Sequence, residues 1–141
     1  MINDQISEIW KNDIEQLIFE ARNNPLRRSR INLHKSTDYG SQKMLIALFH
    51  DSKVGMHRHP TDKSETYIPL IGELEVDYLE ADQIRTIKTN SINSFENLSK
   101  IVTHSFGVWH QPKSISEYCV YLEIYDGPFF KPKDVEYLNE F

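Results

Sequence analysis

Histidines spaced like metal ligands are the residues of this sequence whose types and positions point most directly to chemistry. His57 and His59 are two residues apart, and in an extended chain such residues point to the same face. Glu65 follows where a strand is predicted to begin, and His110 lies far along the chain in a Gly-x-x-His sequence. A His-x-His pair alone is often surface chemistry. Three neutral imidazoles and a carboxylate, however, suit one divalent metal ion: zinc, iron, manganese, nickel or cobalt.

An amphipathic helix is predicted at the N-terminus, because apolar residues recur there at three- and four-residue spacing. Asn3 or Asp4 could cap its start, and Pro25 would end it. We expect residues 1–25 to form a helix that packs on the main body or at the interface of a homodimer. The stripe includes Trp10 and several Ile and Leu side chains, which is more apolar area than one end of a small domain needs.

Short strands separated by turns are predicted for most of the remaining chain. Gly72 would supply the special backbone angle of a hairpin turn between two of them. Many short strands without interleaved helices indicate a β-sandwich or barrel, and the length of the chain fits one domain. The predicted strands cover residues 44–49, 65–70, 74–79, 84–87, 91–95, 101–106 and 117–125.

Composition and charge exclude several classes of protein. The net charge of −5 argues against nucleic acid as a partner, because affinity for phosphates comes mainly from Lys and Arg. The single Cys119 allows no intramolecular disulfide, and we expect it to be a buried small hydrophobe. The sequence shows neither an apolar run of spanning length nor the features of a signal peptide. We therefore expect a cytoplasmic protein that does not bind membranes.

Four arginines follow the predicted helix, at Arg22, Arg27, Arg28 and Arg30. A basic cluster of this kind is usually a solvated face. It could also be a clamp for a phosphate or carboxylate, because the planar guanidinium offers a fork of donors. Spacing alone leaves both interpretations open.

The metal-ligand pattern resembles the two motifs of the cupin superfamily. His57-x-His59, five residues, Glu65, six residues and Gly72 resemble the first motif, and residues 105–110, Ser-Phe-Gly-Val-Trp-His, resemble the second. The resemblance implies a mainly β fold, a single cupin-type jelly-roll β-barrel at residues 26–141 with an N-terminal α-helix. It also implies that His57, His59, Glu65 and His110 are the metal ligands. The gap before Glu65 is longer than usual, and Asp51 and Ser105 replace a glycine and a proline of the family pattern.

Nearly the whole chain is similar to the WbuC-type cupin-fold metalloproteins. Members of that family are similar to products encoded in bacterial O-antigen clusters, so the resemblance implies a protein that acts on or recognises a sugar or sugar nucleotide in surface-polysaccharide biosynthesis. The matching residues are Arg30, Asn32, His34, Gln42, His57, Arg58, His59, Pro60, Glu65, Thr66, Leu70, Gly72, Gly107, Trp109, His110, Glu123, Gly127, Pro128 and Phe129.

The reaction stays open at this stage. One hypothesis is an isomerase or epimerase in which His34 moves a proton. A second is a non-catalytic metal-containing protein that binds a saccharide or a small acid, and a third is an iron-dependent oxygenase. The ligand is expected to be a small saccharide or carboxylate. Polar residues that could line its pocket, or only satisfy backbone groups and orient the metal ligands, are Arg30, Asn32, Gln42, His104 and Glu123.

Overall fold

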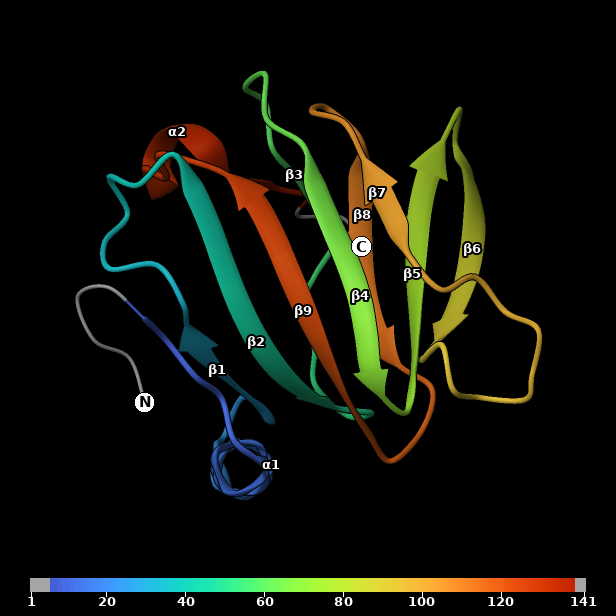
Figure 1. Cartoon of the computed structure of the whole chain (residues 1–141). Helices are drawn as coiled ribbons and strands as arrows, with labels where there is room; N and C mark the ends of the chain where they lie inside the picture. The colour runs from blue at the N-terminus through green and yellow to red at the C-terminus, as the bar shows by residue number, and fades with distance from the viewer. Residues whose placement is uncertain (1–5, 139–141) are drawn as a thin grey trace.

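Two five-stranded antiparallel sheets make up most of the computed structural model, which describes residues 6–138 (Figure 1). One sheet has the strand order β1-β2-β9-β4-β7 and the other β10-β3-β8-β5-β6. The strands are β1 (Arg28–Asn32), β2 (Ser41–Phe49), β3 (His57–Arg58), β4 (Glu65–Ile71), β5 (Glu73–Glu80), β6 (Gln83–Asn90), β7 (Val102–His104), β8 (Trp109–Ser114), β9 (Tyr118–Asp126) and β10 (Glu136–Tyr137).

This arrangement confirms the mainly β, jelly-roll prediction. Within residues 6–138 no strand pairing joins the two sheets, so the molecule is a jelly-roll sandwich rather than a closed barrel. In the same residues, no helix is long and apolar enough to span a membrane.

Strand β2 shows how alternation divides the chain between two environments. Successive side chains of a strand point to opposite faces. Leu45, Ala47 and Phe49 pack against the helix outside the sheet, whereas Leu48 belongs to the core between the sheets. Because both faces of β2 are covered, its sequence is a nearly continuous apolar run.

Helix α1 (Lys11–Asn23) is shorter than the sequence predicts. It begins at Lys11 and not near residue 3, because Trp10 is extended and its backbone N–H donates to the Asp13 carboxylate at 2.8 Å. The expected caps Asn3 and Asp4 lie outside the described residues. The apolar stripe, with Leu17 and Ala21 fully buried, covers β1 and β2, and Figure 1 shows α1 end-on beside these strands.

The predicted hairpin at Gly72 is wrong. Strand β4 pairs with β7 and β9, whereas β5 pairs with β6 and β8, so the chain passes from one sheet to the other at this glycine. Gly72 has φ of +76°, and a Cβ atom there would lie 2.6 Å from both Ser116 Oγ and Tyr118 O. A corner this tight accepts only glycine.

Several other parts of the chain differ from the predictions, among them β3, β8 and β10, which the predicted strands do not include. Strand β1 was not expected, and residues 91–95 are not a strand. Strand β6 continues through Thr89 and Asn90, which the predicted strands do not include. Both are buried, but their polar groups are satisfied: Thr89 Oγ1 donates to Leu74 O at 2.8 Å, and Asn90 Nδ2 donates to Glu96 O at 3.1 Å. A short helix, α2 (Lys131–Asp134), precedes β10.

The interior has an apolar end and a polar end. Leu48, Leu74 and Cys119 lie where β2 ends and β5 and β9 begin, and they belong to the main apolar core. Cys119 is fully buried, as expected. The opposite end, where β4 and β8 begin, contains the histidines.

Candidate metal centre

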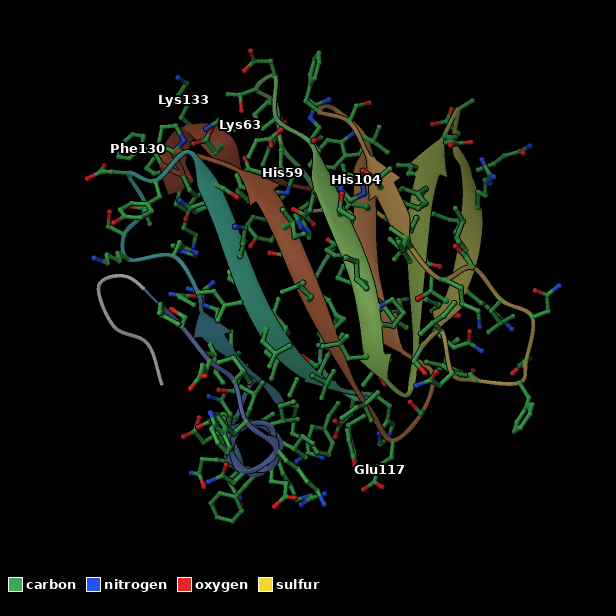
Figure 2. The ribbon with its side chains drawn as sticks, in the orientation of Figure 1. His59, Lys63, His104, Glu117, Phe130 and Lys133 are labelled. Carbon is green, nitrogen blue, oxygen red and sulfur yellow. The ribbon has the colours of Figure 1, made fainter. Side chains whose placement is uncertain are left out.

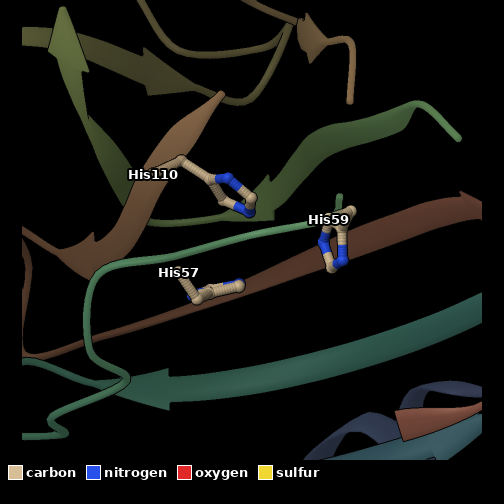
Figure 3. A group of neighbouring side chains, drawn as sticks. All are labelled: His57, His59 and His110. Carbon is tan, nitrogen blue, oxygen red and sulfur yellow. The ribbon is translucent and has the colours of Figure 1, made fainter. Parts of the chain in front are cut away.

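The four predicted metal ligands come together between the sheets. They are His57 in β3, His59 just after it, Glu65 at the start of β4, and His110 in β8. We call these four residues the His/Glu cluster. Each is at most 9% exposed. Figure 3 shows the three imidazole rings directed towards one space, and their candidate ligand atoms lie within 4.8 Å of one another.

Backbone carbonyl groups hold the three rings in one tautomer. The Nδ1 atoms lie 2.9 Å from Gly55 O for His57, 2.8 Å from Asp134 O for His59 and 2.8 Å from Val108 O for His110. A carbonyl oxygen can only accept, so each Nδ1 carries the hydrogen. Each Nε2 is then the atom left to face the centre of the cluster, which is the arrangement that metal-binding histidines need.

Glu65 is the only acid in the cluster, and it contacts two of its histidines. Its Oε2 lies 2.6 Å from His59 Nε2, and its Oε1 lies 3.5 Å from His110 Nε2. Burial acts to raise the pKa of Glu65, but the neighbouring imidazoles of His110 and His59 hold it well below its usual range. Burial likewise acts to lower the pKa of His59, but Glu65 raises it above its usual value. When no metal is bound, a proton shared between His59 Nε2 and Glu65 Oε2 lets these two atoms form a hydrogen bond.

Two buried atoms of the cluster have no hydrogen-bond partner among the described residues. They are Glu65 Oε1 and His110 Nε2. Because His110 carries its hydrogen on Nδ1, two acceptors face each other here, and buried acceptors left unsatisfied are costly. A divalent cation between them would satisfy both, so the donor set fits a metal ion.

The loop before Glu65 is long, but it is anchored at both ends. Gly107 N–H donates to His59 O at 2.8 Å, which ties the two motifs together. Ser64 donates from both N and Oγ to Asp126 Oδ2 at 3.0 Å. These bonds fix the point at which β4 begins. Glu65 therefore lies beside the histidines although the segment between His59 and Glu65 is longer than usual.

Sequence reasoning missed the contribution of the C-terminal segment. Asp134 orients His59 through its backbone oxygen, and its buried carboxylate lies 3.1 Å from Lys63 Nζ and accepts from Thr61 Oγ1 at 3.0 Å. The Tyr137 ring lies 5.6 Å from the His57 ring. No sequence signal could have identified the role of Asp134 towards His59, because every residue has the same carbonyl group.

A chamber opens beside the cluster, formed by two cavities of about 250 and 440 Å³ that share His57, Arg30 and Glu123 in their linings. We call the two together the chamber. The expected pocket residues line the smaller cavity, with the exception of His104. This cavity is lined by Arg30, Asn32, His34, Thr37, Gln42, Met44, His57, His59, Glu65, Glu123, Tyr125, Phe129, Val135 and Tyr137.

Two of these residues are also held by the backbone. His34 Nδ1 lies 3.1 Å from both the nitrogen and the oxygen of Lys43. The Gln42 side-chain amide donates to Tyr39 O at 2.8 Å and to Ser36 O at 3.2 Å. The Gln42 NH2 group therefore holds the loop that contains Thr37, a residue that lines the smaller cavity.

The arginine cluster is split between two environments. Arg27 is paired with Asp51 at 2.9 Å and lies over the Phe49 ring, as does Arg22, away from the chamber. Arg28 and Arg30 are two apart on β1, and both line the larger cavity. The two guanidinium groups of β1 are therefore the members of the arginine cluster that lie beside the chamber.

Glu123 is a partly buried carboxyl group that lines both cavities. Burial and the charge of Glu65 raise its pKa well above the usual range, against the opposing charge of Arg30. The Glu123 carboxyl group is therefore protonated more readily than an ordinary one, and it can donate a proton or a hydrogen bond into the chamber.

His104 lies behind the cluster and lines neither cavity. Burial and then His110 lower its pKa to about 3. The same two causes lower the pKa of His57 to about 4. Both rings are thus neutral at physiological pH.

Comparison with solved structures shows the cupin fold. A protein from Shewanella oneidensis aligns with a TM-score of 0.61 at 11% identity, over 77% of this chain and 72% of that chain. An oxalate oxidase in complex with the substrate analogue glycolate aligns with a TM-score of 0.60 at 11% identity, over 82% of this chain and 57% of that one. Bacillus subtilis oxalate decarboxylase aligns with a TM-score of 0.53 at 18% identity, over 71% and 24%. At these identities the likeness establishes the fold alone.

Comparison at the sequence level gives the family. The search of curated proteins found no match. A family profile described as "Domain of unknown function (DUF6016)" matches residues 9–89, which is more than half of the chain. The protein is therefore a cupin-fold member of the DUF6016 family.

Proposed function

We propose that this chain is a metal-binding cupin-fold protein in which His57, His59, Glu65 and His110 hold one divalent ion. One observation carries the proposal: Glu65 Oε1 and His110 Nε2 are buried 3.5 Å apart, and neither has a hydrogen-bond partner among the described residues. Two acceptors in this position need a cation. Three imidazoles and one carboxylate are ligands that first-row divalent metals accept.

The ligand that we propose for the chamber is a small carboxylate. Arg28 and Arg30 line the larger cavity, and an arginine fork matches a carboxylate with two parallel donors. The oxalate oxidase with a similar fold binds glycolate as a substrate analogue. When bound, the metal would polarise a carbonyl or hydroxyl group of the ligand. Arg30 would orient the carboxylate, and the Glu123 carboxyl group would supply or take up a proton.

The metal is tested by elemental analysis of the purified protein. We expect one divalent ion per chain, and we expect the triple variant His57→Ala/His59→Ala/His110→Ala to lose it. His50→Ala is the control, because His50 is exposed and its Nδ1 lies 3.2 Å from Glu117 O, outside the cluster. A triple variant that keeps stoichiometric metal would show that the assignment is wrong.

The ligand is tested by calorimetric titration of the metal-loaded protein with glycolate. We expect Arg30→Gln to weaken binding about 10- to 100-fold, the cost of losing a hydrogen bond to a charged group. Arg85→Gln is the matched control, because Arg85 lies exposed on β6. Equal affinity in the wild type and Arg30→Gln would remove Arg30 from the ligand site.

The narrower function stays a prediction. It comprises the resemblance to the WbuC-type proteins, a sugar or sugar nucleotide of bacterial O-antigen synthesis as ligand, and an isomerase or epimerase with His34 as the proton-transferring residue. His34 lines the chamber, which is compatible with that role. Titration with sugar nucleotides beside glycolate separates the ligand classes. Turnover separates an enzyme from a non-catalytic binding protein, and a requirement for iron and oxygen would identify an oxygenase.

We also propose a homodimer that buries the surface around α1. Exposed apolar side chains lie in or next to this helix: Trp10 is 62% exposed, Phe19 57% and Leu26 60%. Sedimentation equilibrium at micromolar concentration should give twice the mass of one chain. A mass of one chain would contradict the proposal.

A further inference from the structure

We propose that His104 is a fifth donor of the metal centre, in addition to the four residues of the His/Glu cluster. This inference rests on the metal site proposed above, and it concerns a residue that neither cupin motif contains.

Strand pairing places His104 at the cluster. His104 is the last residue of β7, and its register partner on β4 is Glu65. Side chains of directly opposed residues lie on the same face of a sheet. His104 Nε2 lies 3.9 Å from Glu65 Oε1, and the His104 and His110 ring centroids are 3.9 Å apart. Figure 2 shows His104 and His59 at the end of the sheet where β4 begins.

Like two atoms of the His/Glu cluster, His104 Nε2 is buried and has no hydrogen-bond partner within residues 6–138. Glu65 Oε1, His110 Nε2 and His104 Nε2 are all buried and unsatisfied. These three residues also form a group whose candidate ligand atoms lie within 4.8 Å of one another. Two histidines and one carboxylate are by themselves a recognised set of metal donors.

The other nitrogen of His104 has a partner that permits ligation. Tyr78 Oη lies 3.0 Å from His104 Nδ1. A phenol oxygen can accept a hydrogen bond, and when it does so Nδ1 carries the hydrogen and Nε2 keeps its lone pair. Tyr78 Oη then fixes the tautomer of His104, as a backbone carbonyl oxygen fixes that of each of the other three histidines.

The distances allow Glu65, His110 and His104 to share one ion. Atoms that each lie about 2.1 Å from a common ion are at most about 4.2 Å apart. The separations of Glu65 Oε1 from His110 Nε2 and from His104 Nε2, 3.5 and 3.9 Å, both lie within that limit. His110 belongs to both groups of candidate ligands, and its single Nε2 lone pair cannot serve two ions.

A purely structural role would leave the geometry of His104 unexplained. Its ring packs against Tyr67 and Tyr78, and an apolar ring would make the same contacts. A histidine used only for packing would leave an unsatisfied nitrogen beside a carboxylate, which is costly. As a fifth donor, His104 would take one of the two positions that four ligands leave open on a six-coordinate ion.

The experiment uses Co2+ as the probe, because its visible absorption reports the number and type of its ligands. Metal-free wild type, His104→Phe, His104→Asn, His110→Ala and His50→Ala are titrated with Co2+ in competition with a chelator. We expect both His104 variants to bind Co2+ about 10- to 100-fold more weakly than wild type, with an altered spectrum, since even outer partners of metal ligands contribute this much. His50→Ala should behave as wild type.

The outcomes separate this inference from the proposed function. If both His104 variants keep the wild-type affinity and spectrum while His110→Ala loses binding, His104 is not a ligand and the four-residue site stands. If His110→Ala also binds as wild type, the proposed function is wrong. Circular dichroism of the metal-free proteins identifies a variant that fails to fold. His104→Asn, which is smaller and polar, decides the matter if His104→Phe does not fold.

Discussion

His57 and His110 lie directly opposite each other on β3 and β8, with ring centroids 4.3 Å apart. This single register contact joins the two sequence segments that supply the histidines. Side-chain direction alternates along a strand, so a slip of one residue would turn His110 to the outer face. The pairing of these two short segments therefore decides whether the cluster exists.

We predict that the metal-free protein loses stability as pH falls from about 6.5 to about 4. Burial, and then His110, lowers the pKa of His57 to about 4 and that of His104 to about 3. The unfolded chain therefore binds more protons than the folded chain in this window, and stability rises with pH there. Urea midpoints of chelator-treated protein at pH 6.5, 5.5 and 4.5 should decline in that order.

His59 does not offset this loss. Burial acts to lower the pKa of His59, but Glu65 raises it above the usual value. The stabilisation from this pair is thus fully present below about pH 6.5 and is lost as pH rises through the folded pKa. His104→Phe should reduce the decline below pH 6.5. Equal midpoints at all three pH values in the wild type would contradict the prediction.

Removing the metal should lower the free energy of unfolding but leave the protein folded. A ligand bound only by the folded state at 100 times its Kd contributes about 2.7 kcal/mol. The apolar core around Leu48, Leu74 and Cys119 lies at the other end of the sheets and does not depend on the ion. We expect a chelator at pH 7.5 to lower the melting temperature of the metal-loaded protein and to leave its far-UV circular dichroism unchanged. The triple histidine variant, given the same chelator, should not change.

Asp134→Asn should destabilise the protein by roughly 1–3 kcal/mol at pH 7. The Asp134 carboxylate is 1% exposed, and it pairs with Lys63 and accepts from Phe130 N at 2.6 Å. Burial acts to raise its pKa, but these partners lower it, so their contribution is present above about pH 3.8 and is lost as pH falls through the folded pKa. Urea unfolding measures the change, with the exposed Asp38→Asn as control. Equal losses in the two variants would contradict a specific role for Asp134.

Gly72→Ala should cost at least roughly 1–3 kcal/mol from its backbone conformation alone. Its φ is +76°, and the added Cβ would overlap Ser116 Oγ and Tyr118 O. The control is Gly40→Ala, because a Cβ at Gly40 would meet nothing within 4 Å. Thermal unfolding of the two variants should show a large decrease in melting temperature only for Gly72→Ala. A similar small change in both would show that the corner tolerates a side chain.

The identities of the candidate ligands could be predicted from the sequence, for a local reason. His57 and His59 share a face because side-chain direction alternates along an extended chain, and this does not depend on the rest of the fold. The mainly β architecture was predictable too, since short apolar runs with turns between them carry their own signal. Gly72 was recognised as a position that needs a special backbone angle.

Longer-range relationships were decided only by the tertiary structure. The position of Gly72 between two predicted strands does not reveal that β4 and β5 belong to different sheets. The partners of each strand come from distant parts of the chain. Likewise, His104 reaches Glu65 only because β7 pairs with β4. Asp134 orients His59 through a carbonyl group that every residue possesses. Sequence thus determined which side chains could bind a metal, and strand pairing determined which of them meet, because register between distant strands is a property of the folded chain as a whole.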